Sequence, residues 1–217
     1  MPSLLDLRAQ QTNPFPKKQS GGKTINTSKV VAGKTVSRDP KTIKGIGIHQ
    51  TACVFGPLND RAKAHRRALT IPAHVTAFRD GVYVASAPLP WLLYHGNALN
   101  EFSLGLECEG RYPGLLDKPS TWGGEPTPLT DEAIETFRAA LKWLVEEGRA
   151  AGMPIEFIWA HRQSNGQKPS DPGEGIWKHV VLEYGVPVLG LRTQPEKVWR
   201  DGKTVPPQWD PRGVGKY

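Results

Sequence analysis

With 217 residues, 38% of them hydrophobic, and a formal net charge of +7, the chain is long enough for one domain with extensions and apolar enough for a buried core. No stretch approaches the ~20 consecutive apolar residues of a membrane-spanning helix, which excludes a transmembrane segment of that kind. The N-terminus shows no basic region followed by an apolar run, so we expect synthesis in a cytoplasm without a secretory signal.

The first part of the chain, residues 1–43, is expected to form a basic N-terminal arm. Residues 1–44 carry nine Lys or Arg against two Asp or Glu and thus hold the whole net charge. A solvated arm is one interpretation, and attraction to a polyanion such as an anionic envelope polymer or a lipid surface is the other. Nucleic acid is disfavoured as a partner, because the arm lacks interleaved aromatic residues on which bases could stack.

After the arm, the hydrophobic pattern alternates between strand and helix. The order predicts an α/β domain with a single mixed central β-sheet flanked by helices. We place this domain at 44–185 and a Pro- and Gly-rich extension, packed on the domain or trailing it, at 186–217. The predicted elements are a strand at 44–51, a helix at 59–69, a hairpin of 73–77 with 82–87, a strand at 103–109, a helix from 130, a strand at 155–160 and a helix at 175–184.

The helix from 130 has the clearest signals at its ends. Thr130 suits the N-cap, and Asp131 and Glu132 in the first turn favour the positive end of the helix dipole. Gly152 and Pro154 end the helix. Its buried stripe is expected to consist of Ile134, Phe137, Leu141, Leu144 and Val145.

The two cysteines, Cys53 and Cys108, do not form a CxxC motif. In a reducing compartment such cysteines stay unpaired, so we expect two free and mostly buried thiols.

Three predicted strands each end in a residue that can bind a metal or move a proton: His49, Glu107 and His161. Asp171 follows His161 after a Gly-containing loop. Open α/β folds bind ligands at the carboxyl ends of their strands. Catalytic zinc takes three protein ligands and leaves a position for water, whose proton a nearby carboxylate can accept. These residues therefore predict a hydrolytic zinc site.

Seven short segments together carry a family resemblance. The chain resembles the type 2 N-acetylmuramoyl-L-alanine amidases, which share a fold with peptidoglycan recognition proteins, over about residues 44–185. The segments are Ile48-His49-Gln50-Thr51-Ala52, Pro72-Ala73-His74-Val75, Arg79-Asp80-Gly81, Tyr94-His95-Gly96-Asn97, Phe102-Ser103-Leu104-Gly105-Leu106-Glu107, Ala160-His161-Arg162 and Lys168-Pro169-Ser170-Asp171-Pro172-Gly173.

The resemblance implies a Zn²⁺ ion bound by His49, His161 and Asp171. It also implies that Glu107 is the general base for hydrolysis of the amide between the lactyl group of N-acetylmuramic acid and L-alanine in peptidoglycan. Glu109, on the same face of its strand, is the fallback base.

One position departs from the family. In many members a Lys two residues before the last ligand steadies the oxyanion, whereas here Ser170 immediately precedes Asp171 and Lys168 stands three residues before it. Either Lys168 or Ser170 is expected to take this role.

Substrate contacts are expected from His95, Asn97 and Trp122. For His95 a structural role is the alternative. Trp122 lies in a Gly- and Pro-rich segment, 111–127, whose composition predicts a loop that forms a wall of the cleft. Its indole suits stacking on a sugar ring as well as packing.

These features favour a monomeric, bacteriolytic amidase, such as a phage or prophage endolysin that acts on the cell wall after release from the cytoplasm. A cytoplasmic muropeptide-recycling amidase would use the same chemistry. A non-catalytic peptidoglycan-binding module is the third alternative. The complete set of His49, His161, Asp171 and Glu107 favours an enzyme over such a module.

Overall fold

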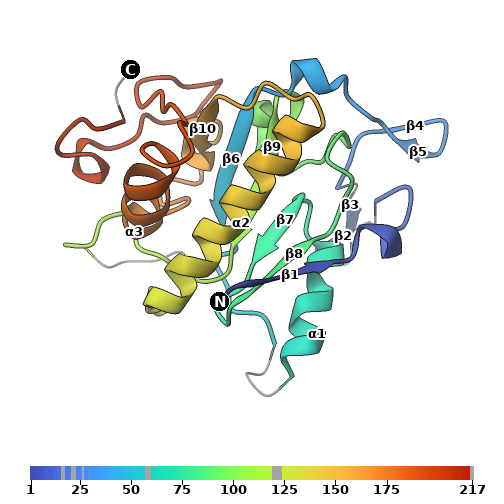
Figure 1. The fold of residues 1–217 in the computed structure, drawn as a ribbon, viewed down its shortest axis with the longest axis horizontal. Coiled ribbons are helices and arrows are strands. Elements are labelled where there is room, and N and C mark those ends of the chain that lie inside the picture. Colours follow the sequence, from blue (N-terminus) through green and yellow to red (C-terminus); the bar gives the residue numbers. More distant parts are fainter. Residues whose placement is uncertain (16–17, 21–22, 26, 57–59, 119–123, 216–217) are drawn as a thin grey trace.

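The computed structural model describes residues 1–15, 18–20, 23–25, 27–56, 60–118 and 124–215. A six-stranded sheet in the order β1-β8-β7-β9-β6-β10 forms its centre (Figure 1). Strands β7, β9, β6 and β10 run parallel, while β8 is antiparallel to β7 and parallel to β1. The strands are β1 Ser3–Asp6, β6 Gly45–Gln50, β7 Val75–Ala77, β8 Val82–Ala85, β9 Ser103–Cys108 and β10 Phe157–Ala160.

Helices cover both faces of this sheet, so the predicted mixed α/β architecture is confirmed. The helix α2 (Asp131–Ala150) lies across one face, and α1 (Arg61–Arg66) covers the other face beside β8 (Figure 1). Thr130 caps α2 by accepting a hydrogen bond from the backbone N–H of Ala133. The cap expected from the sequence is therefore present.

The last predicted helix takes an unexpected form. A short helix α3 (Glu174–Ile176) continues directly into a π-helix, Trp177–Gly185. Gly173 turns the chain into α3 with φ of +106°, a conformation that side chains other than glycine rarely adopt. The apolar periodicity predicted a regular α-helix here. It does not distinguish an α-helix, in which each N–H bonds to the carbonyl four residues earlier, from a π-helix, in which it bonds to the carbonyl five residues earlier.

The main core lies between the sheet and α2. Alternate residues of β6 and β9 belong to the same buried cluster as Phe137 and other apolar residues of α2. Side chains at the positions between them therefore project from the opposite face. The inward-facing residues of the two strands are Ile46, Ile48, Leu104 and Leu106.

The first 43 residues contribute to the same sheet as the rest of the chain. β1 pairs with β8, and Leu7, Phe15 and Arg38 are buried. A sequence signal for β1 was lacking, because all four of its residues are exposed at the edge of the sheet. Two small hairpins complete this part, β2 (Lys18–Ser20) with β3 (Lys23–Ile25) and β4 (Val30–Val31) with β5 (Lys34–Thr35).

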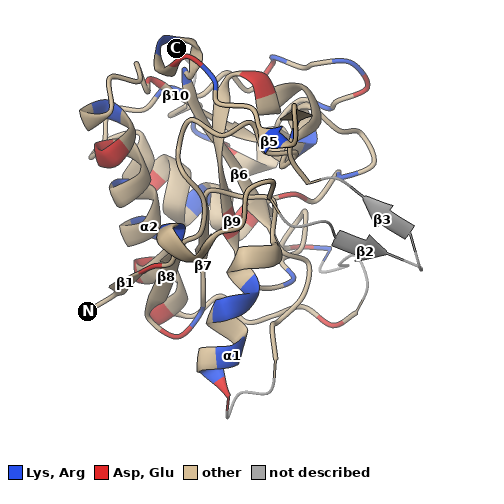
Figure 2. Ribbon diagram, turned by 90° about the vertical axis from the view of Figure 1, so that its right-hand side faces the viewer, with Lys and Arg blue, Asp and Glu red and all other residues tan. Residues whose placement is uncertain are grey.

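Basic residues in the described chain do not gather on the first 43 residues alone. Lys and Arg lie on α1 as well as on the β4–β5 hairpin (Figure 2). Within the described residues no helix is long and apolar enough to cross a membrane.

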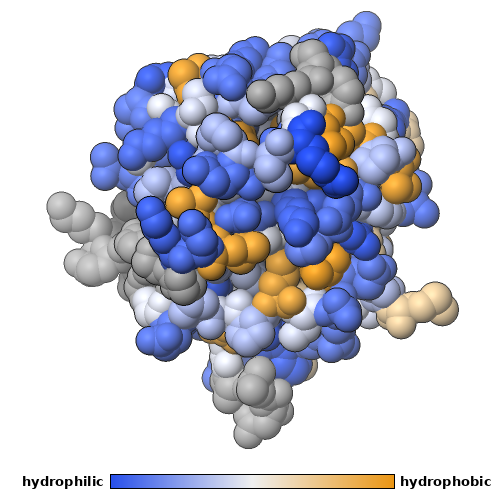
Figure 3. All heavy atoms as spheres, turned by 90° about the vertical axis from the view of Figure 1, so that its left-hand side faces the viewer, coloured by the Kyte–Doolittle hydropathy of each residue, from blue (hydrophilic) through white to orange (hydrophobic). Residues whose placement is uncertain are grey.

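The segment after Val186 packs against the domain. Trp209 is fully buried, with its ring centroid 6.0 Å from that of Trp177. The face formed by α3 and this segment is mainly hydrophilic, with small, separate apolar groups (Figure 3). Both cysteines are free, Cys108 buried and Cys53 half-buried, which confirms the expected thiols.

Candidate metal centre

The ends of three neighbouring parallel strands position the predicted site. In the register of β6 and β9, His49 lies opposite Glu107. β10 pairs with β6 on its other side, and His161 follows directly after its last residue, Ala160. Residues in register on parallel strands point to the same face, so His49 and Glu107 share the face away from α2.

His49, His161 and Asp171 converge in space. Each offers one ligand atom, and the three atoms all lie within 4.8 Å of one another in a buried cluster. His161 Nδ1 lies 2.9 Å from Asp171 Oδ2, and the ring centroids of the two histidines are 4.5 Å apart. Residues 49 and 171, more than a hundred positions apart, are thus brought to one point.

The donor set fits a zinc ion. Two imidazoles and a carboxylate are a common catalytic zinc set, and ligand atoms about 3.3 Å apart suit tetrahedral bonds of about 2.0 Å. Among the described residues, His49 Nδ1 is buried and has no hydrogen-bond partner. Such an atom is costly to bury unless something coordinates it. A metal ion held between these three side chains would satisfy it.

The electrostatics keep His49 in the form that binds metals. Burial holds the pKa of His49 well below its usual value, and electrostatic interactions with His161, His95 and Lys168 act in the same direction. A neutral imidazole with a free lone pair is the ligating form.

Gln50 is a residue of this centre that sequence reasoning did not single out. Its backbone N–H donates to Asp171 Oδ1 at 2.8 Å, which leaves Oδ2 facing His161. Its side-chain amide is bonded to the backbone of Tyr112 and to the carbonyl of Ser170. The signal available in the sequence was an amide immediately after the candidate ligand His49, at the end of a buried strand.

Lys168 and Ser170 lie differently with respect to the cluster. The charge of Lys168 contributes to lowering the pKa of His49. Ser170 packs against the loop after β9, since a Cβ on Gly114 would lie only 2.8 Å from Ser170 Oγ. The two residues that the sequence left open are therefore not equivalent.

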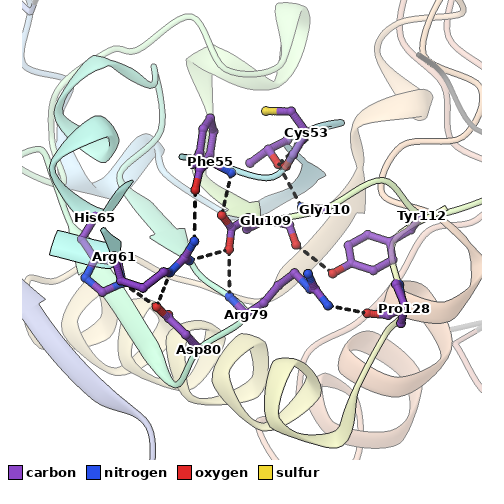
Figure 4. A network of polar contacts seen from close by, with 11 residues as sticks. Cys53, Phe55, Arg61, His65, Arg79, Asp80, Glu109, Gly110, Tyr112 and Pro128 are labelled. Atoms are coloured by element: carbon purple, nitrogen blue, oxygen red, sulfur yellow. Dashed lines mark hydrogen bonds and ion pairs between the residues drawn. The ribbon is translucent and has the colours of Figure 1, made fainter. Parts of the chain in front are cut away.

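Glu109, the fallback base, is held in a separate polar network (Figure 4). Its carboxylate is fully buried and accepts hydrogen bonds from the Phe55 N–H at 2.8 Å, the Arg61 guanidinium at 2.9 Å and the Arg79 N–H at 3.1 Å. Arg61 also binds Asp80 at 2.6 Å. These bonds engage both carboxylate oxygens of Glu109 away from the cluster.

The three expected substrate contacts lie in different places. His95 is buried beneath His49, with Nδ1 at 3.1 Å from His49 Nε2 and Nε2 at 3.3 Å from the carbonyl oxygen of Ser103. Burial and the nearby charge of Arg38 lower the pKa of His95 to about 3. Asn97 is exposed and donates to the carbonyl of Ser164 at 3.3 Å. Trp122 lies outside the described residues.

Comparisons with known proteins show the family and the fold of the chain. The profile of the N-acetylmuramoyl-L-alanine amidase family matches residues 39–174, more than half of the chain. No curated protein sequence matches the chain.

Solved structures show a similar fold. One is the N-acetylmuramoyl-L-alanine amidase LysC from Clostridium intestinale, at 14% identity and a TM-score of 0.50, over 88% of this chain and 100% of that one. The endolysin N-acetylmuramoyl-L-alanine amidase LysCS from the same organism is also 14% identical, with a TM-score of 0.50, over 88% of this chain and 98% of that one.

Proposed function

Because the chain belongs to the N-acetylmuramoyl-L-alanine amidase family, we propose that it hydrolyses the amide between the lactyl group of N-acetylmuramic acid and L-alanine in peptidoglycan. We further propose that the reaction depends on a zinc ion held by His49, His161 and Asp171. The observation that carries this proposal is the convergence of these three buried ligand atoms within 4.8 Å, with Glu107 in register beside His49.

Zinc held by these residues would act as a Lewis acid that lowers the pKa of a nearby water molecule. Glu107 is the proposed general base. It takes the proton of the attacking water, and it returns a proton to the amine of L-alanine as that group leaves. Its place next to a ligand on the adjacent strand suits this role, whereas the bonds around Glu109 disfavour the fallback.

Lys168 is the proposed donor to the oxyanion that develops on the lactyl carbonyl. Its charge already acts on His49, whereas the Ser170 hydroxyl packs against Gly114. Loss of an oxyanion donor costs about 10²–10³ in kcat, so Lys168→Met should be far slower than Ser170→Ala. Asn97 is proposed to contact the substrate from its exposed position.

The proposed setting is the bacterial cell wall, attacked by an endolysin. The similar fold of an endolysin amidase and the basic composition of residues 1–44, suited to anionic envelope polymers, support this setting. A recycling amidase would instead prefer soluble muropeptides. Comparing turnover of intact sacculi with that of soluble muropeptides separates the two, and faster cleavage of the soluble substrate would contradict the endolysin proposal.

The decisive experiment is mass analysis of purified peptidoglycan after digestion. We expect new L-alanine amines and free lactyl acids, and we expect both to disappear when a chelator is added and to return with zinc. Binding to peptidoglycan without any cleavage would identify a binding module and refute the proposed enzyme.

Substitutions of two nearby glutamates, Glu107 on β9 and Glu109 just after it, test the proposed base. Glu107→Gln should keep its zinc and lose about 10²–10⁴ in kcat. Glu109→Gln is the matched control, and its folded fraction should retain turnover. Full activity of Glu107→Gln would refute the assignment.

A further inference from the structure

His95 lies on a floor made of two glycines in register. Gly47 on β6 and Gly105 on β9 are paired neighbours, and each precedes a site residue by two positions. A Cβ on Gly105 would lie 2.7 Å from His95 Cγ, and one on Gly47 would lie 3.1 Å from His95 Cε1. Any side chain on Gly105 would therefore displace the imidazole.

The partners of His95 determine the direction of its hydrogen bonds. Nε2 faces the carbonyl oxygen of Ser103 at 3.3 Å and, at 3.5 Å, the hydroxyl of the same residue, which itself donates to the carbonyl of Leu99. Both of these oxygens accept, so the proton of a neutral His95 lies on Nε2. The Nδ1 atom of His95 then carries a lone pair, and among the described residues the hydrogen-bond donor that faces it is His49 Nε2, at 3.1 Å.

The hydrogen bond to His95 also determines which nitrogen of His49 is protonated. If Nε2 donates to His95, the lone pair of the neutral His49 ring lies on Nδ1. This is the buried atom that has no hydrogen-bond partner among the described residues. The backbone carbonyl of Ser103, which accepts the hydrogen bond from His95, is itself held in place, because Arg38 Nη1 donates to it at 2.7 Å.

We infer that His95 is a positioning residue that holds His49 in the Nε2–H tautomer and so aims Nδ1 at the metal. Arg38, which lies just before the segment matched by the family, anchors the Ser103 carbonyl that ends this hydrogen-bonded series. The inference rests on the proposed function in one respect, namely that His49 is a ligand. Groups that orient a ligating histidine in this way are worth 10–100-fold in metal affinity.

The tautomer is measurable in the metal-free wild-type protein. Long-range ¹H–¹⁵N correlation spectra, assigned with His49→Asn and His95→Asn, should show a protonated Nε2 and a bare Nδ1 on both rings. A proton on Nδ1 of His49 would overturn the inference. Because this measurement uses no zinc and no substrate, it stands whether or not the protein is an active amidase.

Zinc affinity, measured by competition with a chromophoric chelator, gives the second test. His95→Phe keeps a ring but removes the acceptor, and it should bind zinc 10–100-fold more weakly. His95→Asn places an amide oxygen near the Nδ1 position and should recover part of the loss. The matched control is His179→Phe, which removes a histidine bonded to Glu183 on the π-helix and should not change the affinity.

The outcomes separate the two proposals. Wild-type affinity in His95→Phe would overturn the positioning role. A wild-type protein that binds no zinc would instead refute the proposed function. If His95→Phe does not fold, the tautomer in the wild-type protein still decides the inference.

Discussion

Gln50→Ala should weaken both the fold and the metal centre, because one amide joins two loops at the site. Gln50 Nε2 donates to the carbonyls of Tyr112 at 2.8 Å, Ser170 at 2.7 Å and Pro172 at 3.1 Å. Its Oε1 accepts from the Tyr112 N–H at 2.7 Å. The amide thus links the loop after β9 to the loop that carries Asp171.

The magnitude follows from these bonds. A hydrogen bond contributes about 0.5–1.5 kcal/mol net, and a buried donor left without a partner costs about 1–3 kcal/mol. Removing the amide leaves the buried N–H of Tyr112 without its acceptor and frees the carbonyls of Ser170 and Pro172. We expect the free energy of unfolding to fall by about 3 kcal/mol. Because the backbone N–H that binds Asp171 remains, zinc should still bind, but about 10-fold more weakly.

Urea unfolding of the metal-free protein and chelator competition measure the two effects separately. Gln11→Ala is the matched control, since its amide also donates to two backbone carbonyls, those of Leu69 at 3.2 Å and Ser86 at 2.9 Å. That control should lose stability while keeping wild-type zinc affinity. Unchanged zinc affinity in a destabilised Gln50→Ala would refute the positioning of Asp171 by this amide.

Three further substitutions test other parts of the molecule. Glu109→Gln removes the charge that faces Arg61 in a fully buried site, so urea unfolding should show a loss of about 3 kcal/mol, and a loss below about 1 kcal/mol would contradict the ion pair. Burial raises the pKa of Asp80, but hydrogen bonds from Arg61 and His65 outweigh it and lower the pKa overall. The stabilisation by this carboxylate is thus complete above its unfolded pKa of about 3.9 and is lost at lower pH. The difference in unfolding free energy between the wild type and Asp80→Asn should therefore shrink from pH 7 to pH 3. Trp209→Ala empties a fully buried site in the C-terminal segment and should cost about 4 kcal/mol in a thermal or urea melt, whereas an unchanged melting temperature would show that the segment does not stabilise the domain.

The strands of the site could be predicted because their signals are local. β6 and β9 alternate buried aliphatic residues with glycine and then end in His49 and Glu107. Parallel neighbours place such ends at one edge of a sheet. The sheet order adds that β6 lies between β9 and β10, and this order brings His161 beside His49 and Glu107.

Other features had no local signal. β1 is a short edge strand whose four residues are exposed, so no apolar alternation marked it, and its pairing with β8 joins residues about 80 positions apart. Likewise, nothing in the spacing of the last helix distinguished a π-helix from a regular one.

By itself, the sequence determined which residue types end the strands of the candidate metal centre, because the alternation along a strand and its last residue are properties of a contiguous segment. Tertiary structure alone decided between residues that are equivalent in sequence. Glu107 and Glu109 are only two positions apart in the sequence, yet Glu109, which follows directly after β9, forms a buried ion pair with Arg61 of α1. His95 lies beside His49 because two glycines on neighbouring strands leave room for its ring. That space exists only once the two strands have paired.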